Sequence, residues 1–221
     1  MFFSVARYNF TVGRTIRRLS KGIFGSVFSC VSLALLMPGV VFLRGERVTL
    51  RTIEEEDAEI LQRAYNEPAF QGGLLFRYPT NQLAIETLIE ETTEDDTDDF
   101  HLLICTDEQP VGYVSLFDIR LPGSAALSYW VLPEDRGEGY ATKGAALVID
   151  HAFRTIGLHR IFAWTIDYNE ASQALLRRLG FTHEGTHREH VFRKGDYCDV
   201  EHYGLLASEW DNHDGERDQY S

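Results

Sequence analysis

The segment from Leu127 to Thr142 constrains the fold of this 221-residue chain more than any other. Its pattern predicts an apolar strand, then a turn with Gly137 and Gly139, and then an amphipathic helix from Tyr140. Glycines let the backbone of such a turn pass close to a ligand, and the first N–H groups of a helix have no partner within the helix. Together with the charge of Arg136, they indicate an anion site, and a di- or triphosphate ester is the expected ligand.

Other motifs carry less information. The turn matches neither G-x-G-x-x-G nor G-x-x-x-x-G-K-[ST], so a nucleotide triphosphatase is disfavoured, and no G-x-S-x-G or Cys/His nucleophile pattern is present. Three histidines at close spacing, His183, His187 and His190, would gather around a metal ion on a helix. Neighbours such as Gly185 and Val191 favour strand and turn instead, so no metal site is expected.

The elements around this segment are strands in a row, followed by strands that alternate with helices. Thr52 opens a capping box, Pro68 ends the helix that follows it, and Thr80 is the expected cap of a second helix. Residues 90–99 are nearly all Glu, Asp and Thr, which indicates a solvated connector. This order of elements describes one mixed α/β domain of about 170 residues. The expected elements are a strand or hairpin over 40–52, strands over 100–105, 111–120, 125–132, 159–166, 181–192 and 199–206, and helices over 52–66, 80–89, 140–155 and 171–179.

Charge restricts the partners that the chain can have. It carries 34 acidic and 21 basic residues, a formal net charge of −13, and every acidic residue lies at or after Glu46. Nonspecific binding to nucleic acid is excluded, because it needs a positive surface. Only three of the basic residues are Lys, and an acidic, Lys-poor surface is typical of proteins that work in concentrated salt, where screening removes self-repulsion. An ordinary acidic cytosolic protein is the alternative; the three scattered cysteines also favour the reducing cytoplasm.

The first 39 residues form an extension ahead of the domain. Residues 23–43 carry no charge and follow three basic residues, which would fit a membrane segment or an uncleaved signal. Glycines, serines and Pro38 interrupt this run. The alternatives are that Met37 is the true start or that the extension is soluble. We therefore expect the extension over 1–39, the domain over 40–210 and an acidic flexible tail over 211–221.

The glycine turn resembles the R-x-x-G-x-A acyl-CoA pyrophosphate loop of the GNAT superfamily of N-acetyltransferases, over the stretch Arg136-Gly137-Glu138-Gly139-Tyr140-Ala141. Further segments between about residues 42 and 210 resemble the RimJ/RimL-like branch of that superfamily, in the same order. They are an opening strand at 42–51, a central strand at 111–114, a second cofactor segment at 169–172 with 179–181 and 184–185, and a closing hairpin with Arg188 and 195–199. The resemblance implies a GNAT fold, an α/β fold with a mixed, mostly antiparallel central sheet, splayed strands and helices on both faces.

The same resemblance implies acetyl-CoA as the co-substrate, without a metal. The splayed strand before the turn would offer backbone groups to the pantetheine arm and the thioester. Ser172 is the candidate that protonates the leaving sulfur; otherwise its hydroxyl is a helix cap or a surface group. The implied cofactor-binding residues are Val131, Leu132, Arg136, Gly137, Glu138, Gly139, Tyr140, Ala141, Thr142, Asn169 and Ser172.

The general base stays open. Many relatives carry a Glu about three residues before the Tyr-Trp pair, where this chain has Ala126. Asp118, Glu189 and His190 are alternative bases, and a water relay is another. Catalysis by positioning alone, with the amine losing its proton to solvent, would also work.

The resemblance implies an enzyme that moves an acetyl group to a primary amine, namely the N-terminal amine of a protein of the ribosomal type. The alternatives are an acetyltransferase for a small amine, such as an aminoglycoside or a polyamine, and a catalytically silent acyl-CoA-binding module. The expected partners are acetyl-CoA and the amine acceptor, with no nucleic acid, and with a membrane only through the extension. A homodimer is left open. Loops such as 70–79 would select the acceptor.

Overall fold

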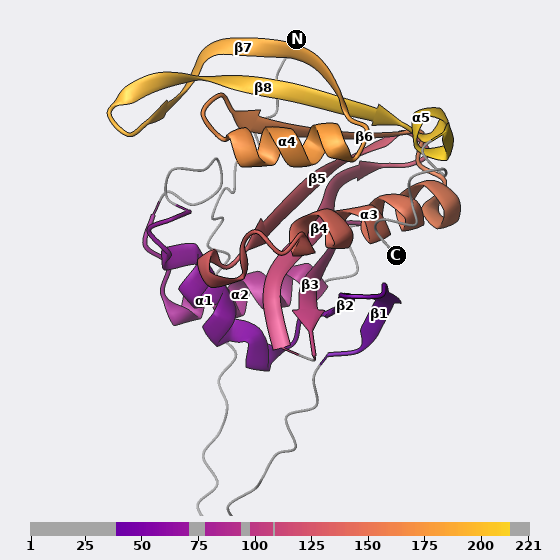
Figure 1. Cartoon of the computed structure of the whole chain (residues 1–221). Coiled ribbons are helices and arrows are strands. Elements are labelled where there is room, and N and C mark those ends of the chain that lie inside the picture. The colour runs from indigo at the N-terminus through magenta and orange to yellow at the C-terminus, as the bar shows by residue number, and fades with distance from the viewer. Residues whose placement is uncertain (1–38, 71–77, 94–97, 108, 213–221) are drawn as a thin grey trace, which may run out of the picture. The chain divides into compact units, whose positions relative to one another are not determined.

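An eight-stranded sheet forms the framework of the chain (Figure 1). The computed structural model describes residues 39–70, 78–93, 98–107 and 109–212. The strand order is β1-β2-β3-β4-β5-β6-β8-β7, and every neighbouring pair is antiparallel except β5 and β6. The predicted α/β class with a mixed, mostly antiparallel sheet is thus confirmed. The strands are β1 (Val41–Arg44), β2 (Thr49–Thr52), β3 (Phe100–Thr106), β4 (Gln109–Arg120), β5 (Ser124–Val131), β6 (Arg160–Ile166), β7 (Thr182–Arg193) and β8 (Asp196–Leu206).

Helices cover both faces of the sheet (Figure 1). Side chains of β3 alternate between two cores: Ile104 belongs to the core with residues of α3 and α4, and Leu103 to the core with residues of α1 and α2. A Cβ on Gly144 of α3 would lie 2.8 Å from Cδ1 of Ile104, so the glycine lets this helix pack closely on the sheet. The helices are α1 (Ala58–Asn66), α2 (Gln82–Thr93), α3 (Tyr140–His151) with a π-helical continuation (Ala152–Ile156), α4 (Glu170–Arg178) and α5 (Ala207–Asn212), and 3₁₀ turns lie at Glu55–Asp57 and Pro133–Asp135.

The one parallel pair of the described sheet is short. Only Ser124–Ala126 of β5 pair with β6, where their partners are Arg160–Phe162. Farther along, β5 stays paired with β4 as far as Val131, and β6 stays paired with β8 as far as Ile166. The two halves of the sheet therefore separate beyond Ala126, and these are the splayed strands that the sequence predicts.

The start of the first helix differs from the prediction. Thr52 belongs to β2, where its N–H donates to the carbonyl of Val40 at 3.0 Å, so it does not cap a helix. Glu54 caps the 3₁₀ turn that leads into α1, and it forms a reciprocal capping box with Asp57. The prediction was wrong by two residues because Thr52 has the composition of a cap but the backbone pairing of a strand.

The second helix is also shifted. Asn81 is the residue that caps it, since its side-chain oxygen accepts the N–H of Ala84 at 2.9 Å. Thr80, the predicted cap, instead donates its N–H to the side-chain oxygen of Asn66 at 3.0 Å. The helix continues to Thr93, so four residues of the predicted connector 90–99 are helical. Glu is a good helix former, and the buried Ile89 holds this part of α2 against the core.

The ends of the chain are described only in part. Residues 1–38, which include nearly all of the predicted extension and most of its apolar run, lie outside the described residues, as do residues 213–221 of the predicted tail. Helix α5 ends at Asn212, two residues inside that tail. In the part of the chain that the structure describes, no helix combines the length and apolar character that a membrane span needs.

A buried ion pair joins β2 to the start of α1. The guanidinium of Arg51 donates two hydrogen bonds of 2.7 Å to the carboxylate of Asp57, which also accepts the N–H of Glu54. The side chains of the pair are only 6% and 8% exposed. The hydrogen-bonded Asp57 carboxylate raises the pKa of Arg51 above its ordinary value, so the guanidinium keeps its charge in the core.

We expect Asp57→Asn to lower the free energy of unfolding by on the order of 3 kcal/mol, because it leaves the buried charge of Arg51 without its counter-ion. Urea denaturation followed by circular dichroism measures this change. Asp118→Asn is the matched control: it removes a carboxylate from the exposed pair with Arg120, whose side chains are 69% and 47% exposed. That variant should change the free energy of unfolding by less than about 1 kcal/mol. Equal losses in the two variants would contradict the role given to the buried pair.

Candidate functional site

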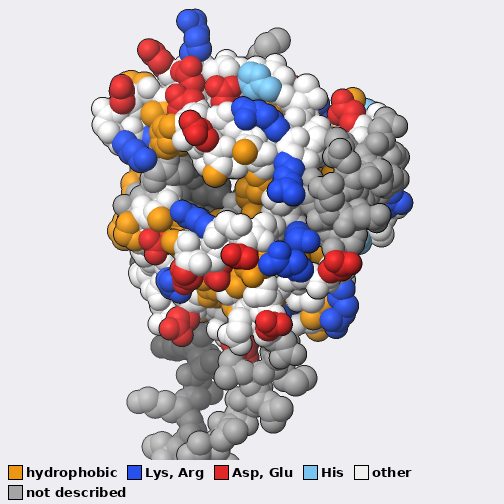
Figure 2. Space-filling model, viewed as in Figure 1, with side chains coloured by type: hydrophobic (Ala, Val, Ile, Leu, Met, Phe, Trp, Pro, Cys, Tyr) orange, Lys and Arg blue, Asp and Glu red, His pale blue; other side chains and the backbone are white. Residues whose placement is uncertain are grey.

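A pocket of about 640 Å³ opens where β5 and β6 separate. Its walls are residues 127–131 of β5, residues 163–166 of β6, the glycine turn, the first turn of α3 and one side of α4 from Ala171 to Arg178. Figure 2 shows a hollow on this face of the molecule, with basic side chains around its mouth. Because these parts of β5 and β6 pair with no strand across the gap, alternate backbone N–H and C=O groups along each wall face the pocket without a strand partner and can bind a ligand.

The glycine turn lies at one end of this pocket. Gly137 and Gly139 have φ values of +89° and +80°, which side chains rarely allow, and a Cβ on either residue would meet no atom within 4 Å. Helix α3 starts at Tyr140, and the N–H of Lys143 bonds the carbonyl of Gly139 at 3.0 Å. The N–H groups before Lys143 have no carbonyl one turn earlier in the helix, so they are available for an anion such as a diphosphate.

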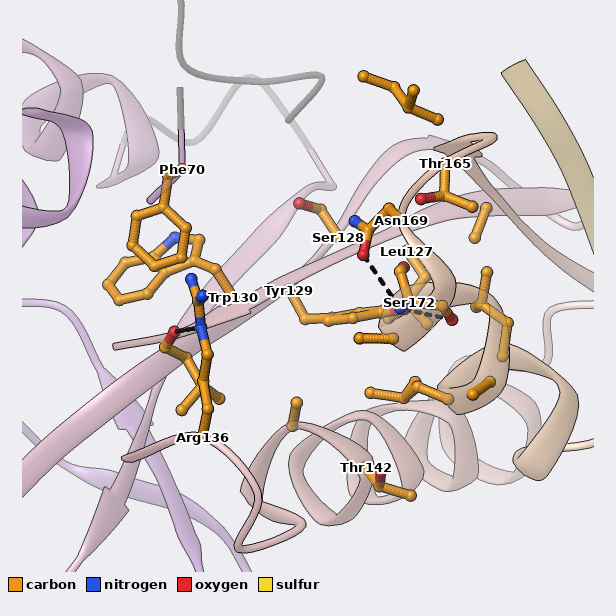
Figure 3. Close-up of a pocket in the computed structure, with 18 of the residues that line it drawn as sticks. Phe70, Leu127, Ser128, Tyr129, Trp130, Arg136, Thr142, Thr165, Asn169 and Ser172 are labelled. Atoms are coloured by element: carbon orange, nitrogen blue, oxygen red, sulfur yellow. Dashed lines mark hydrogen bonds between the residues drawn. The ribbon is translucent and has the colours of Figure 1, made fainter. Parts of the chain in front are cut away.

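The side chain of Arg136 leans into the pocket over an aromatic stack (Figure 3). Its guanidinium carbon lies 5.0 Å from the ring centroid of Phe70, and its Nε donates to the carbonyl of Val131 at 3.4 Å. Phe70 packs on Trp130 with 5.7 Å between ring centroids, and Trp130 stacks on Tyr113 with the same separation and an angle of 7°. These contacts hold the positive charge of Arg136 inside the pocket.

A pair of hydroxyl groups lies on the other side of the pocket (Figure 3). The hydroxyls of Ser172 and Tyr129 share a hydrogen bond of 2.7 Å, and either oxygen can be the donor. Asn169 caps α4, and its side-chain oxygen accepts the N–H of Ser172 at 3.2 Å. Desolvation raises the pKa of Tyr129 above its ordinary value, so the phenol stays protonated. Ser172 can therefore release a proton toward the pocket while Tyr129 supplies one to the serine oxygen.

The charge of the pocket is opposite to that of the chain. Among the described residues that line it, three are basic, Arg136, Arg178 and Lys194, and one, Asp135, is acidic. The chain as a whole carries −13. Desolvation, and then the charge of Glu134, raises the pKa of Asp135 above its ordinary value. The pocket thus suits a ligand with several negative charges.

All but two of the predicted cofactor-binding residues line the pocket. Leu132 does not, because its N–H donates to the carbonyl of Val111 and its side chain packs in the core with α1 and α2. Glu138 does not either; its carboxylate faces Arg47 at 3.5 Å. Ser172, the predicted acid, lines the pocket, and Asn169 rather than Ser172 is the helix cap. The roles of these residues stay predictions.

The structure does not bring the predicted bases to the pocket. Asp118 lies near the end of β4 and pairs with Arg120 at 3.0 Å. Glu189 is exposed on β7, where its N–H donates to the Asp199 carboxylate at 2.7 Å. His190 lies beside another histidine of β7, and none of the three candidates is a lining residue. No cluster of metal ligands is found among the residues that the structure describes.

Several lining residues were not predicted from the sequence. They include Ala69, Asp135, Trp164, Tyr168 and Lys194. Asp135 could have been found, because it directly precedes the turn that the motif identifies. The others come from a loop, from β6 and its end, and from the β7–β8 turn, and no local pattern shows that these segments return to the pocket.

Comparison with known proteins gives a consistent result. Residues 47–182 match the family model described as an acetyltransferase (GNAT) domain. YdaF of Bacillus subtilis, to which ribosomal N-acetyltransferase activity is ascribed, is 27% identical over 173 residues, which cover 75% of this chain and 94% of that protein. Spermidine N(1)-acetyltransferase of Escherichia coli is 26% identical over 152 residues, 68% of this chain and 81% of that protein. The structure of RimL, a ribosomal L7/L12 α-N-protein acetyltransferase in complex with coenzyme A, has the same fold, with a TM-score of 0.69 at 22% identity over 76% of this chain and 98% of that one.

We expect Gly139→Asp to weaken the binding of coenzyme A by at least about 100-fold, because it places a carboxylate where the diphosphate would lie. Isothermal titration calorimetry measures this affinity. Gly157→Asp is the control: Gly157 also has φ +80° and open space around its Cβ position, but it is not a lining residue. It introduces the same strain and charge away from the pocket, so its affinity should stay within about twofold of the unchanged protein. An unchanged affinity in Gly139→Asp would refute the phosphate role of the turn.

Proposed function

The chain belongs to the GNAT family and is an N-acetyltransferase, and on this premise we propose that it acetylates the N-terminal α-amine of a protein, with acetyl-CoA as the donor. The observation that carries the proposal is the charge of the pocket between β5 and β6, which is basic although the protein is acidic. Its described lining residues include the hydroxyl pair of Ser172 and Tyr129 and a single carboxylate. This combination favours a polyphosphate donor and an acceptor without several positive charges.

Acetyl-CoA fits the residues that are present. The diphosphate would bind the N–H groups at the start of α3, where Gly137 and Gly139 leave open space, and Arg136 would contribute its charge. The pantetheine arm carries amide groups, and these would pair with the free backbone edge of β5 as an added strand does. Bound in this way, acetyl-CoA supplies a thioester carbonyl that an amine can attack.

Two side chains, Ser172 and Tyr129, would supply the proton that the leaving sulfur needs during the acetyl transfer. When the C–N bond forms and the C–S bond breaks, the amine loses a proton and the sulfur gains one. Ser172, on the side of the pocket away from Arg136, would donate that proton to the sulfur. The neutral Tyr129 would then return a proton to the serine oxygen through their 2.7 Å hydrogen bond. Since none of the predicted bases lines the pocket, the amine releases its proton to water.

The absence of all three predicted bases from the described lining residues favours an acceptor that is already neutral. An N-terminal α-amine has a pKa of about 8, whereas an alkyl amine has a pKa of about 10.4. At pH 7 the neutral fraction of the α-amine is therefore roughly 200 times larger. An enzyme that relies on positioning alone works best with the less basic amine as acceptor, so the protein N-terminus is preferred over a polyamine.

Charge supports the same choice. A polyamine carries several positive charges, and its recognition requires carboxylates in the site. Asp135 is the one carboxylate among the described lining residues, and a single carboxylate cannot pair with the several positive charges of a polyamine. Relatives of this chain include both a ribosomal and a spermidine N-acetyltransferase, so the support for a protein N-terminus comes from the pocket and not from the comparison.

We also propose the cytoplasm, with concentrated salt, as the working environment. The support is the composition alone: −13 net charge and three Lys among 21 basic residues. High ionic strength screens the repulsion that this charge produces.

The proposal is tested by incubating the full chain with acetyl-CoA and four acceptors: a hexapeptide with a free N-terminus and an internal Lys, the same peptide with its N-terminus blocked, spermidine, and an aminoglycoside. The release of free thiol is followed, and the products are identified by mass spectrometry. We expect only the free peptide to be turned over well, with the acetyl group on its α-amine. Ser172→Ala should lower kcat about 100-fold while the affinity for coenzyme A changes little, because its hydroxyl acts during the transfer.

Three outcomes would contradict the proposal. Faster turnover of spermidine or of the aminoglycoside would identify a small-amine acetyltransferase. Acetylation of the blocked peptide would place the acetyl group on a Lys side chain. Tight binding of coenzyme A without release of thiol from any acceptor would indicate a silent acyl-CoA-binding module.

A further inference from the structure

Lys194 holds a defined place at the tip of the β7–β8 hairpin. Arg193 and Asp196 are the last pair of the two strands, so Lys194 and Gly195 form a two-residue turn. Their φ values are +51° and +90°, the signature of a type I′ turn. This tight turn fixes the backbone from which the Lys194 side chain extends.

The side chain of Lys194 extends to the pocket. It is a lining residue, and its Nζ lies 4.5 Å from the ring centroid of Tyr168. No carboxylate of the described residues forms an ion pair with it. The nearby carboxylates of Asp167 and Asp196 instead accept the N–H groups of the residues that follow them, both at 2.8 Å. The ammonium therefore keeps its hydrogen-bonding capacity for a ligand.

Lys194 belongs to the reacting side of the pocket. Tyr168, which it covers, directly precedes Asn169, and Asn169 orients Ser172. The glycine turn and Arg136 follow β5, whereas Lys194 and Tyr168 belong to the half of the sheet built by β6, β7 and β8. Lys194 thus lies on the opposite half of the split sheet from the proposed phosphate position, on the half that also carries Asn169 and Ser172.

We propose that Lys194 is a specificity residue, and that the acceptor is a polypeptide with an acidic side chain directly after its N-terminal residue. This inference rests on the proposed acetyltransferase function and narrows its acceptor. With the α-amine at the thioester beside Ser172, the side chain of the acceptor's second residue would lie toward Tyr168, where the ammonium of Lys194 can bind a carboxylate. A basic side chain in the same place would be repelled.

The test uses the full chain and three hexapeptides that differ only at the second and third residues, which are Asp-Glu, Gly-Gly or Lys-Lys. The variants are Lys194→Asn and Lys194→Asp. Asn and Asp tolerate positive φ, and Asn-Gly and Asp-Gly are the preferred pairs for this turn, so neither variant should disturb the hairpin. Arg188→Asn is the matched control, because Arg188 is an exposed cation of the same hairpin that does not line the pocket.

The original chain should acetylate the Asp-Glu peptide with a kcat/KM at least about tenfold above that of the Lys-Lys peptide. Lys194→Asn should remove most of this preference, and Lys194→Asp should reverse it, because the preference is a ratio of kcat/KM values between peptides and depends on the charge at this position. Arg188→Asn should keep the original preference.

An unchanged preference in Lys194→Asn would overturn the inference, and so would a rise in the KM for acetyl-CoA as its main effect. If all three peptides are acetylated equally by the original chain, the inference fails while the proposed function stands. If no peptide is acetylated, the proposed function fails and the inference with it.

Discussion

The short parallel pairing of β5 and β6 is the constraint on which the rest of the structure depends. Three residues of each strand pair, Ser124–Ala126 with Arg160–Phe162, and then the strands separate while each keeps its antiparallel partner on the other side. Longer pairing would close the slot between β5 and β6 that forms the pocket, and no pairing would leave two separate sheets. The limited contact creates two strand edges with unpaired backbone groups inside a stable sheet, which is an arrangement suited to a long, amide-bearing ligand.

The two walls of this slot carry different chemistry because they continue into different elements (Figure 3). β5 leads into the glycine turn and the start of α3, so its wall ends in N–H groups and the charge of Arg136. β6 leads into the cap of α4, so its wall presents Ser172, which Asn169 orients. Tyr129 of β5 reaches across to Ser172 and joins the walls. Phosphate binding and proton transfer are thus separated along one slot.

The local chemistry of the site could be predicted from the sequence, but its assembly could not. The turn at Gly137 and Gly139 is a short pattern in which glycine indicates a positive φ, and it lies directly before α3, as expected. Asn169 was expected to contact the cofactor, and the structure shows in addition that it caps α4. Thr52 was assigned wrongly because strand pairing with a distant residue overrode its local cap pattern. Lys194 and the aromatic support of Arg136 depend on loops that return from far along the chain, and a single sequence contains no signal for such a return. The base candidates had suitable chemistry, but the sheet places them outside the pocket.

Amide hydrogen exchange with and without coenzyme A tests the central claim most directly, because it reports on the backbone groups that the account assigns to the ligand. Saturating coenzyme A should slow exchange at residues 137–142, where the start of α3 would bind the diphosphate, and at residues 128–131, along the free edge of β5. Exchange in β1 and β2, on the far edge of the sheet, should not change. Protection elsewhere in the domain, with none at the turn or along β5, would contradict the account.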